Sequence, residues 1–116
     1  MPQPADQEFF ARLAELNEKF AQRLPETLAA LAAQSRLLAG GDRGAPVGEL
    51  QAMLHTLAGS AATFGFRGVG QHARLLEQRL RVLRTFDATA HADWHAWVLE
   101  LDAFVDAARR DPKALT

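Results

Sequence analysis

His55 stands in a run of small residues, a setting typical of an imidazole that reacts with another molecule. The run reads HTLAGSAATFGF from residue 55 to residue 66. Gly59 lies one helical turn after His55, and glycine in a helix interior costs about 1 kcal/mol relative to alanine. The gain that offsets this cost is space, because a partner can come close to a ring that has no bulky neighbour. The pattern therefore indicates a nucleophilic histidine at the edge of a helix core.

A carboxylate is expected at the level of this imidazole. His55 lies 11 residues before Phe66, and Glu77 lies 11 residues after it. If Phe66 marks the turn between two antiparallel helices, these two side chains share one level. A carboxylate beside one ring nitrogen fixes the tautomer and raises the basicity of the imidazole, so that the other nitrogen becomes the nucleophile. A histidine that accepts and releases a phosphoryl group needs this arrangement.

The spacing of apolar residues predicts helices that would position these two groups. Alanine is abundant, and no segment alternates apolar and polar residues in the manner of a strand, so we expect an all-α chain. The first helical segment should begin near Asp6, and Pro25 should kink it or restart it. The sequence GGDRGAP, residues 40–46, should end the second segment. The first segment carries apolar residues at spacings of three and four, namely Phe9, Leu13, Leu16, Phe20 and Leu24.

Three further helical segments follow, at about 46–64, about 69–83, and from Asp87 or Thr89 to Asp111–Pro112. Short connections make neighbouring helices antiparallel. We therefore expect an antiparallel up-down four-helix bundle with an additional short N-terminal helix or turn. Residues 1–116 should form one domain, with 1–5 and 112–116 as flexible tails.

Composition excludes several classes of protein. The formal net charge is −1, from 13 basic and 14 acidic residues, which disfavours nucleic-acid binding. The chain has no cysteine, so it can form neither a disulfide nor a thiolate zinc site. Its first residues lack the pattern of a signal peptide, and its longest uncharged stretch is too short and too polar to span a bilayer. We expect a monomeric, cytoplasmic protein.

The segment around His55 resembles the signature of histidine phosphotransfer (Hpt) domains. That signature usually reads His-x-Leu-Lys-Gly-Ser/Ala-Ala, with a glycine after the helix turns. The ending TFGF is similar to that of the phosphotransfer domain of chemotaxis histidine kinases. The resemblance is close over the third and fourth predicted segments and extends to the architecture of the whole chain. The matching residues are His55, Leu57, Gly59, Ser60, Ala61 and Gly65.

The resemblance implies a phosphorelay intermediate of bacterial-type two-component signalling. His55 would accept a phosphoryl group from the aspartyl phosphate of a receiver domain, or from a sensor histidine kinase, and pass it to another receiver aspartate. Glu77 would orient the imidazole. Ala58 stands where the family has a lysine, and Arg74 could supply the missing cation from the facing helix.

The same resemblance assigns the partner and its metal. The receiver domain of a response regulator would bring Mg²⁺, so we expect no cofactor on this chain. No P-loop is present, and the chain is too short for an ATP-binding module beside the bundle, so we expect no kinase activity of its own. The receiver should dock on exposed residues around the imidazole, namely Gln51, Ala58, Gly59, Ala62 and Phe66.

Two alternative functions remain open. The first is a degenerate bundle of the same shape that binds a receiver without being phosphorylated, which the missing lysine favours. The second is a metal- or cofactor-binding helical bundle that uses His72, His91 and His95. His91 and His95 lie four residues apart and could contact one ion, but no third ligand is evident at a matching spacing.

Overall fold

The computed structural model describes residues 3–86 and 90–116, and the regular secondary structure in this part is entirely α-helical. Four helices follow one another along the chain: α1 (Pro4–Ala39), α2 (Ala45–Ala61), α3 (Arg67–Thr85) and α4 (His91–Arg110). The prediction of an all-α chain is confirmed. The predicted start of the last helix, at Asp87 or Thr89, lies outside the described residues.

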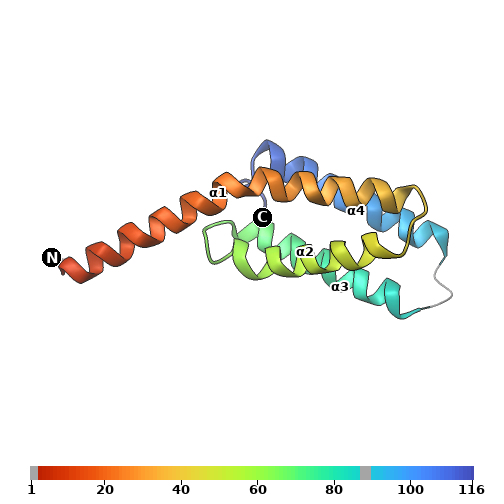
Figure 1. Cartoon of the computed structure of the whole chain (residues 1–116), viewed down its shortest axis with the longest axis horizontal. Helices are drawn as coiled ribbons and strands as arrows, with labels where there is room; N and C mark the ends of the chain where they lie inside the picture. Colours follow the sequence, from red (N-terminus) through yellow and green to blue (C-terminus); the bar gives the residue numbers. More distant parts are fainter. Residues whose placement is uncertain (1–2, 87–89) are drawn as a thin grey trace.

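Helix α1 is continuous through Pro25, so the predicted restart of the helix there is wrong. We expected Pro25 to kink the helix or to restart it after a short N-terminal element, and a single helix of 36 residues includes it, so only the restart is excluded. A proline removes one backbone hydrogen bond and costs about 3 kcal/mol in a helix interior. Leu24 and Leu28, on either side of it, are buried in the bundle, and their packing offsets that cost. Figure 1 shows α1 bending where it joins the bundle.

The N-terminal half of α1 projects beyond the other helices (Figure 1). This projection explains the elongated shape of the molecule, which measures 60 × 25 × 24 Å along its principal axes. Of the apolar stripe on this helix, Leu24 is buried, whereas Phe9 and Leu16 are exposed. The first half of α1 therefore contributes little to the core of its own chain.

The core lies between the C-terminal half of α1 and the three shorter helices. Leucines from all four helices are fully buried in it, including Leu31, Leu54, Leu80 and Leu101. Side-chain contacts show that α3 is antiparallel to both α2 and α4. Gln51 meets Arg84 and His55 meets Glu77 across the first pair. Across the second pair, His72 stacks on Phe104 and Arg79 pairs with Glu100.

A tight turn between α2 and α3 sets their relative height. Gly65 has a φ of 92°, which glycine adopts without strain, and the Phe66 amide donates to the Ala61 carbonyl at 2.8 Å. The chain therefore reverses direction within a few residues, and α2 and α3 run side by side from the same level at the turn. This register brings residues equally far from Phe66 to one level, as the sequence predicts for His55 and Glu77.

The last residues of the chain lie against α3. We expected 112–116 to form a flexible tail, but Leu115 packs against Gly68, where an added Cβ would lie 1.8 Å from the Leu115 carbonyl oxygen. His72 also contacts the Thr116 carbonyl, with Nε2 at 3.0 Å. Since Pro4 is the first residue of α1, part of the expected N-terminal tail is helical as well.

Candidate functional site

His55 projects from α2 into solvent beside the buried carboxylate of Glu77 on α3. The imidazole side chain is 71% exposed, whereas the Glu77 side chain is 5% exposed. Nδ1 lies 3.7 Å from Glu77 Oε1. This separation is longer than a hydrogen bond, and a small rotation of either side chain would close it to the usual 2.7–3.2 Å. Because Nδ1 faces the carboxylate, Nε2 is the nitrogen left to react with another molecule.

Glu77 is held in place by a cation one turn further along α3. Arg81 Nε lies 2.7 Å from the same oxygen, Oε1, and the arginine side chain is 56% exposed. The Arg81 contact is an ion pair and not an aligned hydrogen bond, so Oε1 has no hydrogen-bond partner among the described residues. The Glu77 carboxylate is therefore paired with an opposite charge, while its Oε1 can still accept a hydrogen bond. A buried carboxylate without a paired charge is costly, and Arg81 supplies that charge to Glu77.

The imidazole stands at the edge of a hollow between α2 and α3. Gln51 on α2 and Arg84 on α3 also line this hollow, and their side chains are hydrogen-bonded to each other. The sequence prediction did not include Arg81 or Arg84 among the site residues. Their signal was present in the spacing, since both follow Glu77 on α3 at four and seven residues. The residues that line the hollow are Gly48, Gln51, Ala52, His55, Glu77, Arg81 and Arg84.

Arg74 is exposed on α3, three residues before Glu77, and does not belong to the set that lines the hollow. The cations that do line it, Arg81 and Arg84, follow Glu77 along the helix instead. In an antiparallel pair, residues further along α3 lie beside residues earlier in α2, so they approach the imidazole from the side of Gln51. Arg74 lies nearer to the turn between α2 and α3 than Glu77 does.

The expected docking residues divide into exposed and buried ones. Gly59 and Ala62 are exposed, and a Cβ added at Gly59 would have nothing within 4 Å. Ala58 and Phe66, by contrast, are 9% and 4% exposed, so the expectation that they lie on the surface is wrong. Ala58 faces α3, and the Phe66 ring packs 5.4 Å from that of Phe20. The exposed surface near His55 is therefore narrower than the sequence suggested.

Two of the three other histidines contact a neighbouring side chain. His72 stacks on Phe104, with ring centroids 6.1 Å apart, and His91 Nδ1 lies 3.1 Å from a nitrogen of Arg43. His95 is exposed on α4. Among residues 3–86 and 90–116, no group of three or more His, Asp or Glu side chains is placed to hold a metal ion.

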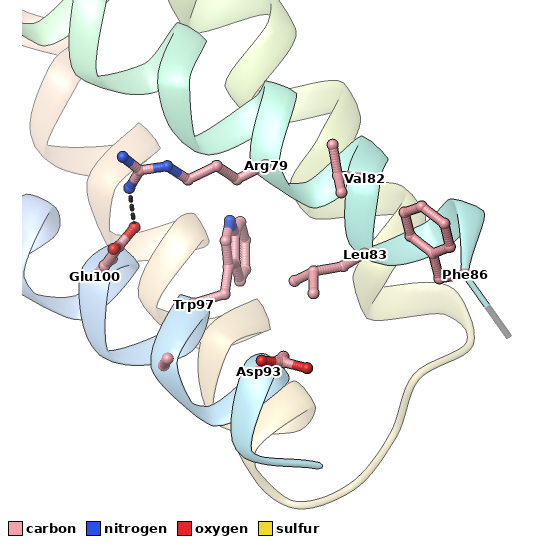
Figure 2. A pocket seen from close by; sticks show the side chains of 8 residues that line it. Arg79, Val82, Leu83, Phe86, Asp93, Trp97 and Glu100 are labelled. Carbon is pink, nitrogen blue, oxygen red and sulfur yellow. Dashed lines mark hydrogen bonds and ion pairs between the residues drawn. The ribbon is translucent and has the colours of Figure 1, made fainter. Parts of the chain in front are cut away.

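A larger hollow, of about 630 Å³, lies between α3 and α4 and shares no lining residue with the one at His55. Figure 2 shows the Trp97 ring between Leu83 and the ion pair of Arg79 with Glu100. The walls of this larger hollow are mostly apolar, and the residues that line it include no histidine, serine or threonine. Size alone does not identify a reactive site, so we place the chemistry at the smaller hollow, where an exposed imidazole meets a buried carboxylate.

Comparison with known proteins gives the family of the chain. In the described part of the chain, no helix combines the length and the apolar character needed to cross a membrane. No curated protein and no solved structure gives a significant match to the chain. A family model does match: the Hpt domain, over residues 7–111. Since these residues make up most of the 116, the chain belongs to the Hpt domain family, the histidine phosphotransfer modules of two-component signalling.

Proposed function

We propose that this chain is a phosphorelay intermediate in which His55 carries the phosphoryl group between the aspartates of two receiver domains, or from a sensor histidine kinase to a receiver. One observation above all supports the proposal: the exposed imidazole of His55 on α2 lies over the buried carboxylate of Glu77 on α3, with Nδ1 3.7 Å from Oε1. Hpt domains are phosphotransfer modules and not kinases, so we propose that the chain has no ATP-dependent activity of its own.

The proposed reaction uses the two ring nitrogens for different tasks. His55 Nε2 attacks the phosphorus of the partner's aspartyl phosphate, the N–P bond forms, the acyl O–P bond breaks, and the aspartate leaves as a carboxylate. Positive charge then develops on the imidazole, and the Nδ1–H group donates to Glu77 Oε1, which balances that charge. The receiver supplies the metal ion and most of the electrostatic stabilisation. Transfer to the next aspartate follows the same steps in reverse.

Arg81 and Arg84 are the better-placed candidates for the cation that Ala58 does not provide. Both line the hollow at His55, whereas Arg74, the cation expected from the sequence, does not. We expect Arg81→Ala to slow transfer from a phosphorylated receiver by roughly 10-fold, the size of effect typical of groups that support a reacting ligand. Arg74→Ala, on the same helix, should leave the rate within about 2-fold and is the matched control. Stopped-flow or quench measurement of the transfer rate checks both, and a slow Arg74→Ala variant beside a normal Arg81→Ala variant would reverse the assignment.

Gly59 is proposed to leave room for the receiver. Inside this chain the glycine has no packing role, because an added Cβ meets nothing within 4 Å. Gly59→Ala should therefore stabilise the fold by roughly 0.5–1 kcal/mol through helix propensity alone. The same methyl group should weaken receiver binding, since it lies one turn from the imidazole. Thermal unfolding and calorimetric titration with the receiver measure the two effects. Tighter or unchanged receiver binding would remove Gly59 from the docking surface.

The proposed function is tested by following phosphate onto the chain. The purified protein is mixed with a receiver domain phosphorylated by a small phosphodonor, and the label on each chain is measured. We expect label on this chain that acid removes and alkali does not, as for an N–P bond; a serine phosphate has the opposite lability. If a receiver binds the chain but leaves no such label, the chain is a docking module, as the absence of the family lysine would then explain.

A further inference from the structure

The hollow at His55 lies on one side of the imidazole only. Its lining residues on α2 all precede His55 in the sequence, and those on α3 are Glu77 and residues that follow it. Because α2 and α3 are antiparallel, these residues lie on the side of the imidazole that faces away from the turn. Ala58, where the family has its lysine, lies three residues after His55, toward the turn. The structure therefore offers space and cations on the side opposite to the missing lysine.

Arg84 brings to this hollow a positive charge that is held in place without being balanced. Its Nη1 group donates a hydrogen bond to the side-chain oxygen of Gln51 on the facing helix. An amide is neutral, so this bond orients the guanidinium and leaves its charge unchanged. Among residues 3–86 and 90–116, Arg84 forms no ion pair with a carboxylate, whereas Arg81 is paired with Glu77.

The charges that line the hollow leave a positive excess. Glu77 contributes one negative charge, and Arg81 and Arg84 contribute one positive charge each. The lining therefore carries one positive charge in excess while His55 is neutral. A guanidinium presents its N–H donors in a planar fork that matches the oxygens of a phosphoryl group. The hollow is suited to an anion of this kind.

The α2 wall of the hollow is built from small residues. A Cβ added to Gly48 would meet nothing within 4 Å, and Ala52 is exposed. Glycine disfavours a helix, and packing inside this chain gives no reason for glycine at residue 48. The hollow has a volume of about 310 Å³. That is several times the roughly 30 Å³ that one water molecule takes in the liquid, so a phosphoryl group has room beside the imidazole.

We propose that the phosphoryl group carried by His55 lies in this hollow and is bound there by Arg84, which Gln51 positions. This inference rests on the proposed function and deepens it. Arg81 remains paired with Glu77, so its charge supports the carboxylate, while the Arg84 charge is available to the phosphoryl oxygens. Gln51 is a positioning residue, because it acts on the phosphoryl group only through Arg84. The task of the family lysine is thereby moved to the other side of the imidazole.

The equilibrium distribution of phosphate between this chain and a receiver tests the contact. Arg84→Ala should shift the distribution toward the receiver by about 10-fold, because only the phosphorylated chain makes the lost charge-assisted hydrogen bond. Arg84→Lys should recover part of this loss, since it restores the charge without the fork. Arg74→Ala removes an exposed arginine of α3 outside the hollow and should leave the distribution within about 2-fold.

Gln51→Glu separates an anion site from a merely structural link between the helices. The carboxylate has the shape of the amide and can still accept from Arg84, so a structural link would be kept or strengthened. In an anion site the new carboxylate balances the Arg84 charge and repels the phosphoryl oxygens. We therefore expect a shift toward the receiver of about 10-fold or more. Gln71→Glu adds the same charge to an exposed position of α3 outside the hollow and should leave the distribution unchanged.

A second readout uses the chain without a receiver. The ¹⁵N-labelled protein is phosphorylated with phosphoramidate, and the Arg84 Nε–H signal in its NMR spectrum should shift while that of Arg74 stays in place. An unmoved Arg84 signal, or a wild-type distribution in both Arg84→Ala and Gln51→Glu, would overturn the inference and leave the proposed function standing. A wild-type chain that takes no acid-labile phosphate from a receiver would instead contradict the proposed function, and this inference with it.

Discussion

Replacing His55 with glutamine is expected to abolish phosphorylation of the chain by a phosphorylated receiver. Glutamine has a similar length and polarity but no nucleophilic ring nitrogen, so the N–P bond cannot form. The imidazole is 71% exposed and lies outside the core, and the substitution should change stability by no more than about 0.5 kcal/mol. The measurement is the acid-labile, alkali-stable phosphate on the chain, which should fall below detection.

His95→Gln is the matched control for this experiment. His95 is also an exposed helical histidine, but it lies on α4, which packs against α1 and α3 and not against α2. Phosphorylation of that variant should equal that of the wild-type chain. Acid-labile phosphate that survives in His55→Gln would place the acceptor on another histidine and would contradict the proposed site.

Changing Glu77 to glutamine should slow phosphoryl transfer by about 10–100-fold, the range found when a carboxylate that orients a histidine is removed. The amide can still contact Nδ1, but it lacks the negative charge that balances the imidazolium formed as phosphate arrives. Glu77 is buried and its Oε1 lies 3.7 Å from Nδ1, so little water is available to take over this task. Rapid-quench measurement of the transfer rate checks the prediction.

The fold should survive this change, because Arg81, which loses its charged partner, is 56% exposed and can be solvated. Glu100→Gln on α4 is the control, since it also removes one carboxylate from an ion pair with an arginine of α3. An unaltered transfer rate in Glu77→Gln would mean that this carboxylate only pairs with Arg81. The histidine would then depend on the receiver alone for its orientation.

The sequence could predict that His55 and Glu77 lie at the same height along the hairpin, because this height depends only on the turn and on the geometry of the two helices. Both residues lie on helices whose buried apolar residues recur at spacings of three and four, and a short turn containing Gly65 joins those helices. With a rise of about 1.5 Å per residue in each helix, equal distances from the turn give equal heights. The Hpt resemblance, which the family model confirms over residues 7–111, rests on the same hairpin.

The surface around the imidazole could not be predicted to the same accuracy. Ala58 lies one turn from His55, where a docking residue was expected, yet it is only 9% exposed. A difference of a few tens of degrees in the rotation of α2 decides whether that position faces solvent or α3, and the sequence periodicity does not resolve it. The same uncertainty favoured Arg74 over Arg81, since both lie within about one turn of Glu77 on α3.

The sequence by itself determined the helical class, the hairpin that brings His55 to Glu77, and the family, because each of these follows from residue spacing within a short segment. Tertiary structure alone decided which apolar faces are covered. The stripe from Phe9 to Leu24 is uniform in sequence, yet the bundle buries Leu24 and leaves Phe9 exposed. The reason is physical: a stripe is buried only as far as other helices extend along it, and their reach depends on how the whole chain packs.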